Sequence, residues 1–226
     1  MVGILLALQI NNWNQGRLDH QKEVLLVKSL DEELAANQHY IKGRIGYLTE
    51  KVEKKVIDLI KLTGPSPTEV SADSISRLLL NVIYQAPYAP VIAKYEHIMN
   101  SDDNNLIRYD TLKQLLFQYK SALDMTFYEQ FEMRDNIIQY LQANYSTLRM
   151  LNQQQGQVFK NLKNEDYTEN YFPVDATIML SDPTFQSMLV TRVEANGFTI
   201  LLLKNLLSHI DEMRGFIQRN YPAWNS

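Results

Sequence analysis

The histidines are the first side chains to consider for chemistry, because an imidazole beside a carboxylate can bind a metal or move a proton. His20 precedes Glu23, and His209 precedes Glu212, by three positions, which is one turn of a helix. Helical di-iron proteins use the opposite order, Glu-x-x-His, together with further inward carboxylates. That order is absent from the sequence. We therefore interpret both pairs as exposed helical pairs and predict no metal ligand.

Other motifs of catalysis and cofactor binding are also missing from the sequence. The chain has no cysteine, no Gly-x-Ser-x-Gly elbow and no glycine-rich phosphate loop. Its formal net charge is −4, so the chain lacks the excess of basic residues that is typical of nucleic-acid-binding proteins. We predict no catalytic residue, no cofactor and no nucleic-acid partner. A helical metal-dependent enzyme is an alternative, and it requires histidines and carboxylates to converge from different helices.

Tyrosine is frequent, with 13 in 226 residues, and several tyrosines lie in the proline-broken middle of the chain. Aromatic rings around a cleft could bind a peptide or a small apolar ligand. The residues that would line such a groove are Tyr84, Tyr88, Tyr95 and Tyr119. Alternatively, the rings fill the tapered end of a bundle and keep their hydroxyl groups in water. The sequence leaves both interpretations open.

Long helices are the elements that must position these side chains. Residues 17–62 contain no proline, and their apolar residues recur in steps of three, four or seven, as on one face of a helix. The same kind of pattern covers residues 109–151 and 183–221. Shorter helices are expected near residues 75–84 and 90–99, and a loop with one helical turn over residues 163–182. Because each apolar stripe must be buried against another, we predict an all-α fold: a long antiparallel helical bundle of three long helices plus shorter capping helices.

The N-terminus has a different character from the rest of the chain. Residues 2–10 are apolar except for Gln9, and the first charged side chain is Arg17. Nine such residues are far fewer than the roughly 20 that a helix needs to cross a bilayer. Trp13 lies among Asn11, Asn12 and Asn14, a composition typical of a membrane–water boundary. Taken alone, the pattern also fits the buried end of an ordinary helix.

Residues 3–14, GILLALQINNWN, resemble a signature of an uncharacterised family of bacterial single-pass membrane proteins. In that family a hydrophobic helix ends in an ALQINNWNE-like string, and a helical domain follows. Gln15 replaces the usual glutamate here. Residues 94–101 and 105–108 are similar to a second stretch of the family. Between them, this chain has Asp102 where the family has a glycine.

The resemblance implies that residues 1–14 are the remnant of an N-terminal transmembrane helix and that residues 15–226 form a helical bundle domain. Its membrane-interface residues would be Gln9, Asn11, Asn12, Trp13 and Asn14. The implied location is the inner membrane, single-pass, with the bulk of the chain in the periplasm. The implied partner is the membrane, through the N-terminus. The long amphipathic helices additionally allow a second copy of the chain or another envelope protein as a partner. We expect an interaction or sensor-like module without catalysis, and a small-molecule-binding or peptide-binding helical protein is the alternative.

Overall fold

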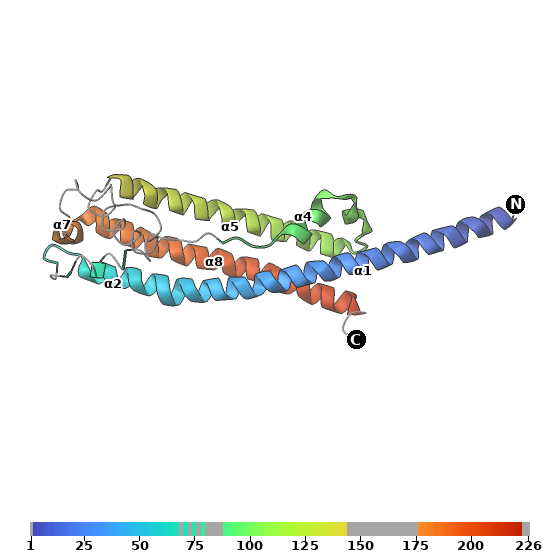
Figure 1. Cartoon of the computed structure of the whole chain (residues 1–226), viewed down its shortest axis with the longest axis horizontal. Coiled ribbons are helices and arrows are strands. Elements are labelled where there is room, and N and C mark those ends of the chain that lie inside the picture. The colour runs from blue at the N-terminus through green and yellow to red at the C-terminus, as the bar shows by residue number, and fades with distance from the viewer. Residues whose placement is uncertain are drawn as a thin grey trace, which may run out of the picture. The chain divides into compact units, whose positions relative to one another are not determined.

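A computed structural model of the chain describes residues 2–67, 70–71, 74–75, 78–79, 88–143 and 176–222. It contains the α-helices α1 (Val2–Tyr47), α2 (Lys54–Leu62), α4 (Ala93–Asn100), α5 (Asp110–Ala143), α7 (Ala176–Ser181) and α8 (Pro183–Asn220) (Figure 1). A π-helix, η1 (Leu48–Glu53), joins α1 to α2, and a 3-10 helix, η2 (Asp102–Leu106), precedes α5. There is no strand in this part of the chain, and the prediction of an all-α helical bundle is confirmed.

The first long helical stretch ends where the sequence predicts it. After Leu62, Thr63 turns to an extended conformation, and its hydroxyl and backbone N–H both donate to the carbonyl of Ile60. Gly64 and Pro65 follow directly, and neither favours a continued helix. The π-helical turn at Leu48–Glu53 was not expected from the apolar pattern, which continues through it with Leu48 and Val52 buried.

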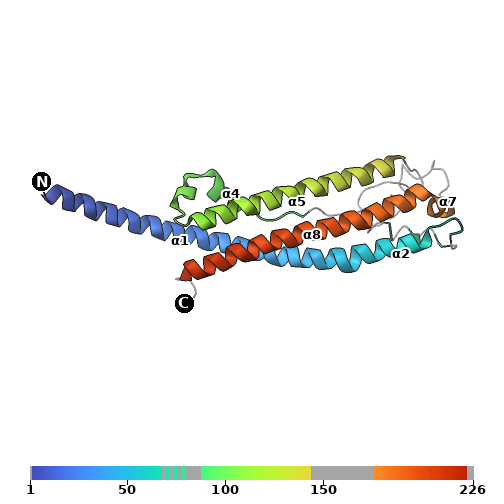
Figure 2. The same ribbon diagram turned by 180° about the vertical axis from the view of Figure 1, so that it is seen from behind.

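The chain divides into two compact units, and each of the long helices α1, α5 and α8 contributes residues to both. Unit 1 comprises residues 1–43, 89–124 and 204–226, so it holds most of α1, all of α4, the first turns of α5 and the end of α8. Within unit 1, α1, α5 and α8 lie side by side in both views (Figures 1 and 2). Its core is formed by Val27, Leu30, Leu34, Ile41, Ile98, Leu112, Leu116, Tyr119, Leu206, Ile210, Met213 and Ile217.

The helix directions in unit 1 follow from its side-chain contacts. Glu23 of α1 contacts Tyr221, directly after α8, and Asp31, further along α1, contacts Arg214, which lies earlier in α8. The two helices are therefore antiparallel. The chain from Arg108 into α5 runs parallel to α1, since Arg108 lies beside Glu23 and Tyr119 lies beside Asn37. We call residues 89–109, which precede α5 in unit 1, the crossover segment.

Unit 2 comprises residues 44–88 and 125–203. Its backbone contacts include the Gly64 N–H, which donates to the carbonyl of Leu180 in α7 (3.0 Å). Helix α7 falls within the stretch predicted to be a loop with one helical turn, of which residues 163–175 are outside the described residues. The core of unit 2 includes Leu48, Val52, Val56, Leu59, Ile75, Leu79, Met179, Phe185, Leu189 and Leu203.

The N-terminal turns of α1 project beyond the other helices of unit 1 (Figures 1 and 2). Among the described helices, none combines the length and the apolar character that crossing a membrane requires. The prediction of a single-pass inner-membrane location with the bulk of the chain in the periplasm is therefore wrong. The physical reason is the short apolar run, which ends at Ile10 and covers only about 14 Å at 1.5 Å per residue, against a hydrocarbon core of about 30 Å. The boundary predicted between residues 14 and 15 falls inside α1, and the proposed division into domains stays a prediction.

Candidate functional site

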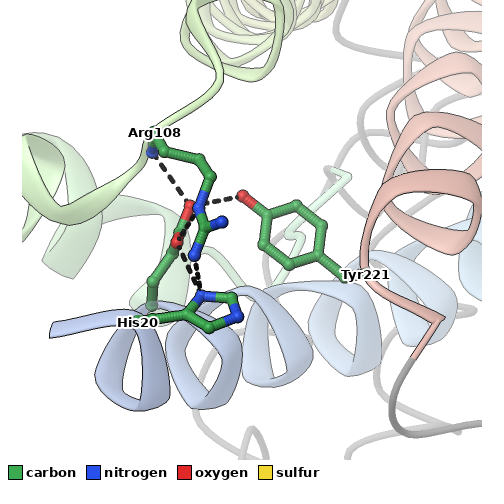
Figure 3. A network of polar contacts seen from close by, with 4 residues as sticks. His20, Arg108 and Tyr221 are labelled. Atoms are coloured by element: carbon green, nitrogen blue, oxygen red, sulfur yellow. Dashed lines mark hydrogen bonds and ion pairs between the residues drawn. The ribbon is translucent and has the colours of Figure 1, made fainter. Parts of the chain in front are cut away.

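Glu23 is the first buried side chain of α1 among the described residues. It is 1% exposed although it is a carboxylate. Its Oε1 accepts hydrogen bonds from the backbone N–H of Arg108 (2.9 Å) and from the Tyr221 hydroxyl (2.7 Å), and its Oε2 accepts one from Arg108 Nε (2.7 Å) (Figure 3). One side chain thus joins α1, the turn before α5 and the residue after α8.

The donors around Glu23 compensate for the burial of its charge. A carboxylate taken out of water without partners costs several kcal/mol, and it is tolerated only when charged and polar donors surround it. The guanidinium of Arg108 supplies the opposite charge and is still 46% exposed, so water partly screens the pair. The backbone N–H of Arg108 and the Tyr221 hydroxyl are the neutral donors. All of these donors belong to the chain itself, so the cluster stabilises the packing of α1 against the start of α5 and the end of α8.

Tyr221 connects the end of α8 to this cluster. Its ring lies edge-on to Tyr109, with centroids 5.4 Å apart, and Tyr109 makes the same kind of contact with Phe216 at 5.6 Å. Burial, and then the hydrogen bond to Glu23, raise the pKa of the Tyr221 hydroxyl well above its usual range. The hydroxyl therefore stays protonated and acts as a permanent donor.

His20 belongs to the same cluster (Figure 3), and its side chain is half-exposed. Its Nδ1 is 3.3 Å from Glu23 Oε2 and also contacts Arg108 Nη2. The sequence-based interpretation of His20 and Glu23 as an exposed pair is only half right, since the imidazole is half-exposed and the carboxylate is buried. Of the second pair, His209 is half-buried and Glu212 is exposed. No three histidine, aspartate or glutamate side chains gather as a metal site would need within the part of the chain that the structure describes.

Two further polar residues of α1 hold the crossover segment. Glu33 accepts hydrogen bonds from the backbone N–H groups of Lys94 (2.7 Å) and Tyr95 (3.0 Å), at the start of α4. The residue at the N-cap position of α4 is Ile92, which offers no side-chain cap, so Glu33 supplies the cap from another helix. Asn37 bonds both backbone groups of Val91, donating at 2.7 Å and accepting at 3.0 Å. A third contact joins α1 to α8, where Arg214 donates to Asp31 and Gln38.

The described tyrosines among those predicted to line a ligand groove belong to two different units. Tyr84 is outside the described residues, and Tyr88 belongs to unit 2, where its buried ring stacks on Phe127 at 6.3 Å. Tyr95 and Tyr119 belong to unit 1 and are buried edge-to-face at 5.4 Å. Burial raises the pKa of Tyr95 to about 12 and that of Tyr119 further still. A groove formed by these residues stays a prediction.

The predicted membrane-interface residues all lie on consecutive turns of α1 and are exposed: Gln9, Asn11, Asn12, Trp13 and Asn14. Asn14 accepts a hydrogen bond from Arg17, and Gln15 donates one to Asp19, so the polar side chains here bond along the helix. No protein-family model, curated protein or solved structure matches the chain. The resemblance of residues 3–14 to a membrane-protein family accordingly stays a prediction.

Proposed function

We propose that the chain is a non-catalytic interaction module that inserts the apolar end of α1 into one face of a lipid bilayer. One observation carries the proposal: Ile4, Leu6, Leu8, Ile10 and Trp13 are between 52% and 70% exposed on a helix. Soluble monomeric proteins rarely expose contiguous apolar surface of this kind, and such surface marks a site of interaction. We call residues 2–18 the apolar arm.

The distribution of apolar side chains around the arm favours lipid over a protein groove. Ile4 and Leu6 are two positions apart, which places them about 200° apart around a helix. Leu8 and Ile10 repeat this arrangement, so residues 4–10 of the arm are apolar on opposite sides. A groove on a partner protein covers one face of a helix, whereas lipid surrounds it. Helices that are apolar all round belong in an apolar medium.

The residues that follow the apolar run bear on the depth of the proposed contact. Trp13 follows this run, and tryptophan prefers the membrane–water interface. The first charged side chain, Arg17, comes one turn later. The arm is therefore suited to enter one face of a bilayer, while Glu23 and the residues after it hold the rest of the helix in unit 1.

Co-sedimentation of the full chain with phosphatidylcholine vesicles tests the proposal. Leu6→Asp with Ile10→Asp removes two apolar side chains, each contributing about 1.5–3 kcal/mol when buried. We expect this variant to bind vesicles at least about 100-fold more weakly than the parent chain. Because apolar burial drives the contact, added salt should leave binding unchanged.

The matched control is Leu25→Asp with Phe117→Asp, two side chains of the bundle that are exposed to a similar degree, 68% and 60%. We expect this control to bind as the parent chain does. Failure of the parent chain to sediment with vesicles, or equal losses in both double variants, would overturn the proposal. Light scattering of the lipid-free protein shows whether the arm joins copies of the chain instead.

A further inference from the structure

One imidazole nitrogen in the Glu23 cluster faces two partners with opposite requirements. His20 Nδ1 lies 3.3 Å from Glu23 Oε2, a hydrogen-bond acceptor, and it contacts Arg108 Nη2, a donor (Figure 3). A neutral imidazole can present a lone pair at Nδ1, whereas the imidazolium presents an N–H there. The two protonation states therefore satisfy different partners.

In the neutral state, Nδ1 accepts a hydrogen bond from Arg108 Nη2, and the positive charge of Arg108 balances the negative charge of Glu23. In the protonated state, Nδ1–H donates to Glu23 Oε2 and meets the N–H of Arg108 head-on. Two cations then flank one carboxylate, and the cluster carries a net positive charge at a half-buried position. Like charges in contact repel, and the repulsion is strongest where water is partly excluded.

We propose that His20 is a proton-sensitive latch: its protonation displaces the Arg108 guanidinium from Glu23 and loosens the joint between α1, the start of α5 and the end of α8. Histidine changes charge near pH 6.5, within the range that cells and their compartments cover. The inference rests on this cluster alone and is independent of lipid binding by the apolar arm.

The surroundings of His20 offer little to offset the added charge. On α1, Asp19 is occupied by the side-chain amide of Gln15. Directly after α8, Tyr221 contributes a neutral hydroxyl that already donates to Glu23, and Tyr109 before α5 contributes an uncharged ring. In η2, Asp103 pairs with His97 at 2.9 Å. Glu23 is thus the carboxylate for which His20 and Arg108 compete.

Hydrogen exchange of the full chain at about pH 5.5 and about pH 7.5, corrected for the intrinsic rates, tests the latch. The informative peptides cover residues 105–112 and 217–222, where the Arg108 N–H donates to Glu23 and the Tyr221 N–H donates to Ile217. We expect protection at these amides to fall by about fivefold at the lower pH, the effect of losing one modest interaction. Circular dichroism should show unchanged helix content.

Two substitutions of the half-exposed His20 isolate its charge. His20→Gln keeps an acceptor for Arg108 and cannot be protonated, so we expect equal protection at both pH values. His20→Lys carries a permanent cation, and we expect low protection at both. His97→Gln is the control and should keep the response of the parent chain. A parent chain without any response, or a His20→Gln variant that keeps the full response, would overturn the proposal.

Discussion

The hydroxyl group of Tyr221 donates a hydrogen bond to Glu23 at 2.7 Å, and so fixes the end of α8 to α1 across 198 positions of sequence. Tyr221→Phe keeps the ring contacts with Tyr109 and removes only this donor. We expect a loss of about 1–2 kcal/mol in the free energy of unfolding, since the buried carboxylate loses one of its donors. Urea titration measures it. The control, Tyr128→Phe at an exposed position, should change stability by less than about 0.5 kcal/mol.

The cap that Glu33 provides to α4 predicts a local effect. Glu33→Ala leaves the backbone N–H groups of Lys94 and Tyr95 without their partner, at a helix that has no cap of its own. We expect a loss of about 1–2 kcal/mol, with faster hydrogen exchange concentrated at residues 93–97. The exposed neighbour Glu32 offers the matched variant, Glu32→Ala, which should leave this exchange unchanged. Equal exchange in the two variants would contradict the role of Glu33.

The buried tyrosines predict that the protein loses stability at alkaline pH. The pKa of Tyr95 is raised to about 12 in the folded chain, and those of Tyr119 and Tyr221 are raised further. Their ordinary value, reached on unfolding, is about 10. Above pH 10 the unfolded chain therefore binds fewer protons than the folded one, so the free energy of unfolding falls as pH rises. Below pH 10 these groups contribute no pH dependence.

Ultraviolet titration of tyrosinate, recorded together with circular dichroism, checks this alkaline behaviour. We expect the last tyrosines to ionise at the same pH at which helicity is lost, because deprotonation then requires unfolding. Tyr119→Phe should move that transition to higher pH, whereas Tyr128→Phe at an exposed position should leave it in place. Full tyrosine ionisation in a chain that stays helical would show that burial does not hold these protons.

Asn196 predicts a link between α8 and the π-helical turn within unit 2. Its buried amide donates to the carbonyl of Leu48 (3.3 Å), the first residue of η1. In a π-helical turn the backbone bond shifts from i→i+4 to i→i+5, which disturbs the partners of neighbouring carbonyls. We expect Asn196→Ala to cost about 1–2 kcal/mol in urea titration, because a buried carbonyl loses a donor. Asn205→Ala, at an exposed position of α8, is the control.

The apolar periodicity predicts the helices well, because helix formation and burial both follow from spacing along the chain. The same spacing also marks two polar residues, because Glu23 and Asn37 lie on one stripe, with steps of three and four, with the core residues Val27, Leu30, Leu34 and Ile41. A polar residue on such a stripe is buried and needs partners. Its presence at positions 23 and 37 could have identified both as structural sites.

The partners of these polar residues could not be derived from the sequence. Arg108 and Tyr221 meet Glu23 because α5 runs parallel to α1 and α8 runs antiparallel to it, and spacing along one helix contains no information about these directions. Periodicity also does not distinguish an exposed apolar helix end from a buried one, as residues 2–10 illustrate. The π-helical turn at Leu48–Glu53 likewise leaves the apolar pattern intact.

The fluorescence of Trp13 tests the central claim, lipid binding by the apolar arm, most directly. Trp224 is the only other tryptophan, so Trp224→Phe leaves Trp13 as the single reporter. If the arm enters the bilayer, adding phosphatidylcholine vesicles shifts the emission of Trp13 to shorter wavelength, and lipids brominated near the headgroup quench it more than lipids brominated near the chain ends. Emission that neither shifts nor is quenched at any lipid concentration would contradict the account.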